Sequence, residues 1–468
     1  MLDVAAELDR APDMIDGALD GALDAGLAAA RTSRGTSFVV LPAPVVAPAA
    51  IVAAWRGASM VAWSSRELAI VGVGIARELR GRGADRFAEI VAQAKAIELG
   101  AIAADAVLGD VWTPRLLGGA AFSPGAADAA PWTGFGDAWF ALPRWTYSVS
   151  PQGPTSSTSA GRLVLAVDAT EARHPGRWHD ELAAFCAAFA SRFAPRPQPP
   201  MSRLDPGDTA AWRDEIRAIT AAISRGEYAK VVAARKALVE LTGEARPADL
   251  LAELDARHGE CVRALVRPPN AATLVAATPE RLVELRGGTR VACDALAGSL
   301  PRDLDASTLL ASDKDRREHA LVVDAIASAL AGLGAHVDAP STPDVRALRH
   351  VWHLHTPIAA TLPSPRHVLE LAAALHPTPA VGGTPTRTAT DWIAAHEMAR
   401  GWYASPIGWF DLDGNGELAV AIRSGVIAGD RAHLWAGAGI VAGSDPDREL
   451  AETDVKLRAM LGALGVAA

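Results

Sequence analysis

Cysteine is scarce in this chain of 468 residues, which contains only three. Cys186, Cys261 and Cys293 stand far apart and form no Cys-x-x-Cys pair, so the sequence offers no thiolate zinc motif and favours a reducing compartment. The first residues carry acidic side chains and no apolar segment, unlike a secretory signal. We therefore expect a cytoplasmic protein.

Long hydrophobic runs and blocks of basic residues are absent as well. The longest uncharged stretch, residues 38–55, contains Pro42, Pro44 and Pro48, which would break a membrane helix, so we expect strands and turns there. The formal net charge is -9, and an acidic chain without a Lys/Arg cluster is poorly suited to nucleic acid or anionic membranes. We expect neither as a partner.

Half of the residues are hydrophobic, which is enough for one or two domains with large cores. Strand and helix patterns are mixed without a regular βαβ repeat, which favours an α+β fold over a doubly wound sheet. The most linker-like segment is the Pro-rich stretch at residues 194–208. We expect helices at residues 1–35, 85–99, 178–193, 210–225, 313–333, 365–374, 388–403 and 446–464, and strands at residues 161–168, 230–239, 273–277, 417–426 and 432–440.

Two short patterns suggest metal sites that their surroundings do not support. Residues 411–416 begin like a calcium-binding loop, but the closing carboxylate would fall at Ile422, so a turn between two strands explains this sequence better. His350, His353 and His355 lie close together without a further zinc ligand nearby in the sequence. We expect no zinc there, although one of these histidines could contact a substrate.

Two charged residues adjoin apolar strands of the C-terminal half. Lys230 begins a strand in which burial would disfavour its charge and make a general base possible, whereas a lysine that reaches solvent is the alternative. Glu280 follows another strand and could act as an acid, or it could be a surface residue at the start of a helix. The residues alone leave both alternatives open.

Three glutamates of two predicted helices form a further candidate group. Glu318 lies in the charged segment 312–319, which also fits a solvated helix face. Glu449 and Glu452 are three residues apart, on one face of a helix that begins near Pro446. Two carboxylates on one face need either water or a cation, and together with Glu318 they would offer the oxygen ligands that suit Mg²⁺.

Taken in order, these segments resemble the chorismate-utilising enzymes, and specifically the isochorismate synthases. The similarity runs from about Arg203 to the C-terminus, with weaker similarity at residues 118–122 and 140–145. It implies an α+β chorismate-utilising fold in which two large antiparallel sheets pack together and helices surround them. Residues 1–468 would then form one domain, with a variable N-terminal half at 1–195 and a catalytic C-terminal half at 203–468.

The resemblance implies an isomerase that adds water at C2 of chorismate and releases the C4 hydroxyl, so that isochorismate forms. Lys230 would be the base that activates the water, and Glu280 would be the acid that protonates the departing hydroxyl. The cofactor would be Mg²⁺, with Glu318 and Glu452 as ligands and Glu449 supporting the ion through water.

The resemblance also implies a set of substrate-binding residues. Tyr403 and Arg423 would hold the enolpyruvyl carboxylate, and Lys456 would neutralise a carboxylate. His353 would lie near the leaving hydroxyl. The other pocket residues that it implies are Ala380 and the glycines Gly298, Gly437 and Gly439.

Two positions separate this chain from related enzymes. Anthranilate synthases carry Gln where Lys230 stands, and aminodeoxychorismate synthases often carry a nucleophilic Lys where this chain has Ala297. Salicylate synthases share both residues and are the alternative function, but residues 352–357 resemble isochorismate synthases more. The segments 404–409 and 419–425 resemble menaquinone-pathway members most, with a siderophore-pathway enzyme or an inactive chorismate-binding relative as further alternatives. We expect a monomer or a weak dimer.

Overall fold

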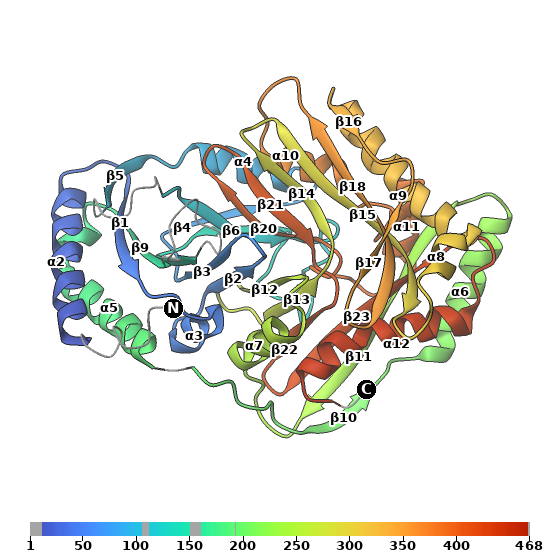
Figure 1. The fold of residues 1–468 in the computed structure, drawn as a ribbon, viewed down its shortest axis with the longest axis horizontal. Coiled ribbons are helices and arrows are strands. Elements are labelled where there is room, and N and C mark those ends of the chain that lie inside the picture. The colour runs from blue at the N-terminus through green and yellow to red at the C-terminus, as the bar shows by residue number, and fades with distance from the viewer. Residues whose placement is uncertain (1–11, 105–111, 150–160, 192, 467–468) are drawn as a thin grey trace, which may run out of the picture.

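The structure, a computed structural model, describes residues 12–104, 112–149, 161–191 and 193–466. Within these residues, helices surround two large sheets, one of 13 strands and one of 10 (Figure 1). The paired strands of the described chain are antiparallel except for β1 (Thr36–Ala43) and β5 (Leu99–Ala104), which are parallel. These features confirm the α+β class and the two large sheets expected from the sequence.

Strands from different parts of the chain are neighbours in both sheets. In order across the first sheet they are β10 (Met201–Asp205), β11 (Lys230–Leu241), β23 (Arg431–Ile440), β22 (Ser424–Ala428), β13 (Thr273–Thr278), β12 (Val262–Arg267), β2 (Met60–Ser64), β3 (Ala69–Val73), β8 (Trp145–Val149), β9 (Gly161–Val167), β1 and β5, and β19 (Gly383–Thr384) pairs with β11. In the second sheet they are β16 (His336–Asp338), β18 (Val351–Thr361), β15 (Arg290–Pro301), β14 (Arg281–Arg286), β21 (Gly416–Val420), β20 (Pro406–Asp411), β6 (Arg115–Ala120), β7 (Ala138–Leu142) and β4 (Arg77–Gly81), and β17 (Asp344–Ala347) pairs with β18. The helices are α2 (Pro12–Arg31), α3 (Pro48–Ala54), α4 (Arg86–Lys95), α5 (Pro175–Ala190), α6 (Thr209–Ser224), α7 (Pro247–Arg257), α8 (Ser307–Ala311), α9 (Asp313–Gly332), α10 (Val368–Leu375), α11 (Thr386–His396), α12 (Pro446–Ala463) and the 3₁₀-helix η2 (Glu171–Arg173).

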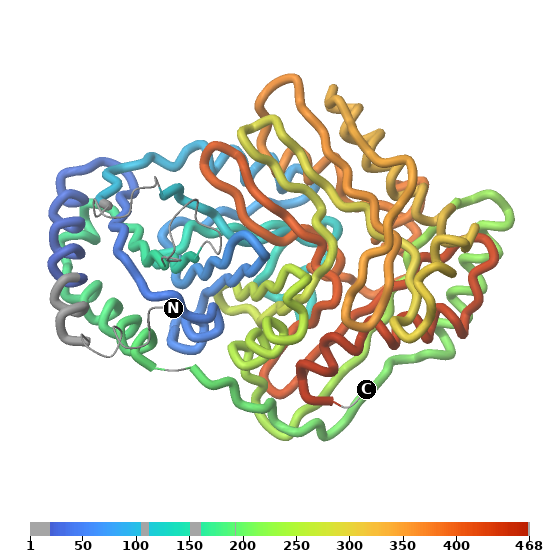
Figure 2. Tube along the Cα trace, in the orientation of Figure 1, coloured from blue at the N-terminus to red at the C-terminus, as the bar shows by residue number. Residues whose placement is uncertain are grey.

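The N-terminal and C-terminal parts of the chain are joined within both sheets. β2 pairs with β12 in the first sheet, and β6 pairs with β20 in the second. The Pro-rich segment runs along the lower edge of the molecule and contributes β10 to the edge of the first sheet (Figure 2). We therefore propose that the chain forms one domain and that this segment is a connection within it.

Apolar side chains cover both faces of the first sheet. One core lies between the two sheets and includes Val231 of β11 and Leu418 of β21. The other core lies on the outer face of the first sheet, where it includes Leu250 of α7 and Leu457 of α12. Helix α12 packs against β23 in this way, and this packing brings the polar residues of the helix close to the glycines of that strand.

Three segments of the chain differ from the expected elements, and one of them, residues 417–426, contains parts of two strands, β21 and β22, instead of one strand. Residues 38–55 contain β1 followed by the short helix α3, whose first residue is Pro48; proline suits a first helical turn because its missing N–H is not needed there. The helix expected at 388–403 ends at His396, so Tyr403 lies in the loop that follows. No helix in the described chain is long and apolar enough to cross a membrane.

Most other elements agree with expectation within a few residues. The helix expected at 1–35 is present as α2, and residues 1–11 lie outside the described part of the chain. Residues 411–416 form the expected turn between β20 and β21. The Asp411 carboxylate accepts hydrogen bonds from the backbone N–H groups of Asp413 and Asn415 at 3.0 and 2.9 Å, which stabilises this turn.

Candidate active site

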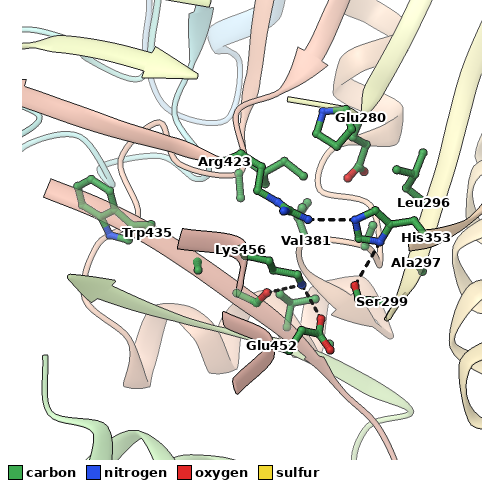
Figure 3. Close-up of a pocket in the computed structure, with 18 of the residues that line it drawn as sticks. Glu280, Leu296, Ala297, Ser299, His353, Val381, Arg423, Trp435, Glu452 and Lys456 are labelled. Atoms are coloured by element: carbon green, nitrogen blue, oxygen red, sulfur yellow. Dashed lines mark hydrogen bonds and ion pairs between the residues drawn. The ribbon is translucent and has the colours of Figure 1, made fainter. Parts of the chain in front are cut away.

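A pocket lies where strands of both sheets meet helices α9 and α12 (Figure 3). It brings together residues that are far apart in the sequence. The predicted site residues that line the pocket are Lys230, Glu280, Gly298, Glu318, His353, Ala380, Tyr403, Arg423, Gly437, Gly439, Glu452 and Lys456. The remaining predicted residue, Glu449, is buried on α12 beside the pocket and contacts Lys314.

Lys230 begins β11 and does not reach solvent, since only 1% of its side chain is exposed. Its Nζ donates a hydrogen bond to Oε1 of Glu318 on α9 at 2.8 Å. A Cβ atom at Gly439 would lie 2.4 Å from that oxygen and 2.7 Å from Cε of Lys230. A side chain at position 439 would therefore force the side chains of Lys230 and Glu318 to shift from this ion pair.

Glu280 lies between β13 and β14 and is only 4% exposed. Its backbone is held at both ends, because its N–H donates to Oγ1 of Thr278 and its carbonyl accepts from the N–H of Val420. Burial raises the pKa of the Glu280 carboxyl to about 8, an effect that the charge of Lys230 opposes but does not cancel. Glu280 is thus a buried, protonated acid near neutral pH rather than a surface residue.

His353 of β18 lies between Arg423 and Ser299 (Figure 3), and its Nδ1 is 3.2 Å from Oγ of Ser299. Its Nδ1–H donates to the carbonyl of Gly298 at 2.9 Å, and its Nε2 accepts from Nη2 of Arg423 at 3.0 Å. Gly298 has a φ of +71° and forms a bulge in β15 opposite His353, which other residues would adopt only with strain. Burial and the charge of Arg423 lower the pKa of His353 to about 3, so a neutral ring orients the guanidinium.

Arg423 lies between β21 and β22 in the left-handed backbone region, with a φ of 49°. This conformation is uncommon for a residue with a side chain and occurs often at functional sites. The chain turns here, so the prediction of one strand over residues 417–426 is wrong. Arg423 is buried, and no carboxylate of the described residues forms an ion pair with it. A buried cation without such a partner is suited to bind an anionic ligand.

Each of the three predicted metal ligands forms an ion pair with a lysine. Two of these pairs join different elements, β11 with α9 and α9 with α12, whereas the third lies within α12. The pairs are Glu318 with Lys230 at 2.8 Å, Glu452 with Lys456 at 2.6 Å and Glu449 with Lys314 at 2.9 Å.

The charges of all three glutamates act on Lys314. Burial would lower this pKa, but the charges of Glu449, Glu318 and Glu452 together raise it. The pKa of Glu449 is raised by burial and by Glu452, as expected for carboxylates that share a small space. Carboxylate oxygens are the ligands that hard divalent cations prefer, so these glutamates are candidate metal ligands by their chemistry, although each is paired with a lysine in the structure.

The sequence did not predict several residues of the pocket wall. Trp435 of β23 stacks on Tyr403 with ring centroids 6.2 Å apart. Arg400 also lines the pocket, but its guanidinium is held by Glu397 and by two backbone carbonyls, so it shapes the wall. Nothing in the sequence separates Arg400 from an ordinary surface arginine. The other lining residues that were not predicted are Val232, Pro279, Leu296, Ala297, Ser299, Val381, Ala404, Ile422 and Ala436.

The other two histidines of the cluster noted in the sequence do not line this pocket. His355 contacts Asp294 through Nε2 at 2.7 Å. The ring of His350 packs near that of His258, with centroids 6.1 Å apart. Of the three, only His353 lies in the pocket.

The fold and the pocket together define an enzyme of the chorismate-utilising type. A solved structure of MenF, the menaquinone-specific isochorismate synthase from Escherichia coli, is similar to the chain with a TM-score of 0.75 and 25% identity. The match covers 95% of this chain and 99% of that structure.

Sequence comparisons identify the family. A family model described as chorismate binding enzyme matches residues 28–465. The chain is 37% identical to the salicylate biosynthesis isochorismate synthase of Pseudomonas aeruginosa over 89% of this chain and 87% of that protein. It is 36% identical to the isochorismate synthase MenF of Bacillus subtilis over 75% of each chain. The chain therefore belongs to the chorismate-binding enzyme family, whose members generally need a divalent metal.

Proposed function

We propose that this protein is an isochorismate synthase, an isomerase that converts chorismate into isochorismate with Mg²⁺ as its cofactor. The observation that carries the proposal is the pairing of a buried amine, Lys230, with a buried protonated acid, Glu280, in one pocket. That pocket also contains the buried cation Arg423, which suits an anionic substrate. Two relatives that are 37% and 36% identical to the chain are named isochorismate synthases.

Each of the two catalytic side chains moves one proton. In this step Lys230 acts as a neutral amine, after the proton of its ion pair with Glu318 has left, and it takes a proton from water while the water oxygen bonds to C2 of chorismate. The ring electrons shift, and the hydroxyl leaves C4 with the proton that Glu280 donates. Water is a poor nucleophile and hydroxide is a poor leaving group, so each transfer contributes a factor of about 10²–10⁴ to the rate.

The cationic residues of the pocket bind the carboxylates of the substrate. Arg423, oriented by neutral His353, donates to the enolpyruvyl carboxylate with the help of Tyr403. Lys456 adds a second positive charge, and its Nζ donates to the carbonyl of Gly437 at 2.8 Å (Figure 3). The substrate is thus fixed at its charged ends, which positions the ring between the acid and the base.

The proposed Mg²⁺ site uses the glutamates of α9 and α12. Glu318 and Glu452 would hold the ion, and Glu449 would support it through water. A bound Mg²⁺ would stabilise the ring carboxylate of the substrate. The combined effect of these three carboxylates on the pKa of Lys314, together with the contact between Lys314 and Glu449, supports this location, because a divalent cation can take over the charge that the lysine now supplies.

A salicylate synthase, which would also eliminate pyruvate from isochorismate, is the second candidate. Lys230 and Ala297 are compatible with both functions, and one relative is named for salicylate biosynthesis although it is itself an isochorismate synthase. A role in menaquinone biosynthesis stays a prediction, with siderophore biosynthesis as the alternative. The cytoplasmic location and the monomeric or weakly dimeric state also stay predictions.

Identification of the product by chromatography tests this proposal. Purified protein mixed with chorismate and Mg²⁺ should form isochorismate. Because the bonds broken and formed are alike, the reaction should reach the same mixture from either compound. Pyruvate released in step with salicylate would favour the second candidate. If folded protein binds chorismate without converting it, the chain is an inactive relative.

A further inference from the structure

A second cleft, separate from the active-site pocket, is lined by residues from the ends of α7 and α12 and from the loop before β18. Its volume is about 360 Å³, and none of its lining residues lines the active-site pocket. The charged and titratable residues of this cleft are Arg257, Arg349, Arg458, His258 and His350. The other lining residues are small or apolar, so they leave space between the charged groups.

Two of these arginines have no counterion. The guanidinium groups of Arg349 and Arg458 are exposed, and neither makes an ion pair or a hydrogen bond within the described residues. Arg257 pairs with Glu253 at 2.9 Å. The chain has 54 acidic and 45 basic residues, so carboxylates are plentiful, yet none in the part of the chain that the structure describes pairs with these two arginines. The cleft therefore carries concentrated positive charge on an acidic protein.

The two histidines lie in the same positive field. Burial, helped by the charges of His350, Arg349 and Arg423 and opposed by Glu260, lowers the pKa of His258 to about 4. The pKa of His350 is also lowered by burial, and then by Arg349 and Arg458. Both rings are thus neutral near pH 7 and can donate an N–H to an anion.

A metal ion does not fit this region as well as an anion does. His258, Glu260 and Cys261 have ligand atoms within 4.8 Å of one another, which is close enough for a metal site. However, burial raises the pKa of the Cys261 thiol to about 12, and Arg423, Arg346 and Arg263 surround it. This positive field opposes a cation and favours an anion.

We propose that this second cleft binds a small organic anion with two or more negative charges, carried by phosphate or carboxylate groups. Arg349 and Arg458 provide planar, fork-shaped donors that match the oxygens of either group. His258 and His350 add neutral donors at the base of the cleft. This inference goes beyond the proposed enzymatic activity, and its test requires no turnover.

Calorimetric titration of the full chain with pyrophosphate and with citrate, at constant ionic strength and without metal, tests the proposal. At least one probe should bind at one site per chain, while formate should not bind. Tighter binding of pyrophosphate would indicate a phosphate-bearing ligand, and tighter binding of citrate would indicate a polycarboxylate. The double variant Arg349→Ala/Arg458→Ala should weaken binding by about tenfold or more.

Two control variants distinguish binding in this cleft from binding elsewhere on the surface or in the active site. Arg34→Ala/Arg66→Ala removes the same charge from exposed positions far from the cleft in the sequence and should bind the probe like the unmodified chain. Arg423→Ala removes the cation of the active site, whose charge also acts on His258 and His350, and should weaken binding much less than the double variant does. Binding that survives in Arg349→Ala/Arg458→Ala, or that is lost equally in either control, would overturn the proposal. If the double variant unfolds, Arg458→Lys keeps the charge, removes the fork and should still weaken binding.

Discussion

Replacement of Glu280 by glutamine is the most direct test of the proposed acid. Burial raises the pKa of this carboxyl from 4.5 to about 8. At pH 7 about nine-tenths of the molecules would therefore hold the proton, compared with well under about 1% for an ordinary glutamate. Glutamine keeps the size of the side chain but has no proton to donate. We expect Glu280→Gln to lower kcat by about 10²–10⁴ while chorismate still binds.

The pH dependence of the wild-type enzyme, compared with that of Glu280→Gln, gives a second measurement. Because the protonated form of Glu280 is required, kcat/KM should fall as the pH rises through about 8. The free energy of unfolding should also fall as the pH rises, because between pH 4.5 and about 8 the folded chain keeps a proton on Glu280 that the unfolded chain has lost. Across this window the free energy of unfolding should decrease by about 5 kcal/mol in the wild type relative to Glu280→Gln.

The assay is the initial rate of isochorismate formation from neutral to alkaline pH, followed by chromatography. Chorismate binding and thermal unfolding of Glu280→Gln show whether the pocket is intact. A wild-type rate that keeps rising through pH 8 would refute the reasoning. The same conclusion would follow if Glu280→Gln lost activity with the same alkaline midpoint as the wild type.

Local signals explain why much of the catalytic half could be predicted from the sequence. Helix α12 begins at Pro446 after Asp445, whose carboxylate accepts hydrogen bonds from the N–H groups of Asp447 and Arg448. Strand β11 was visible from its β-branched and apolar residues. Such signals depend on neighbours within a few residues, so they survive without knowledge of the tertiary structure.

Burial decided the alternatives that the sequence left open. Whether Lys230 reaches solvent depends on Glu318 and Gly439, which adjoin it only in the folded chain. Whether Glu280 is an acid depends on the strands that cover it. The turn at Arg423 could not be predicted either, because left-handed backbone at a residue with a side chain has no local sequence signature and is maintained by the surrounding structure.

Three further sets of substitutions test the remaining parts of the site. Lys230→Gln, which introduces the residue that anthranilate synthases carry at this position, should lower the rate of isochorismate formation about 10²–10⁴-fold with the fold intact. A wild-type rate in this variant would exclude Lys230 as the base. Glu318→Ala and Glu452→Ala should each weaken Mg²⁺ and chorismate binding together in calorimetry, because the ion would contact both protein and substrate. Unchanged Mg²⁺ affinity in both variants would contradict the metal site.

Lys314→Met should have the opposite effect and strengthen the binding of Mg²⁺. The ammonium group of Lys314 lies 2.9 Å from the carboxylate of Glu449. The charges of Glu449, Glu318 and Glu452 raise the pKa of Lys314. Lys314 therefore stays charged, and its charge opposes the binding of another cation. Its side chain is 37% exposed, and solvent weakens this opposition, so we expect Mg²⁺ affinity to rise by about tenfold at most. Without metal the same variant should unfold more easily, because Glu449 would stay buried without a counterion. Weaker Mg²⁺ binding in Lys314→Met would instead mean that the lysine holds the carboxylates in place for the ion, and the idea that the two cations compete would be wrong.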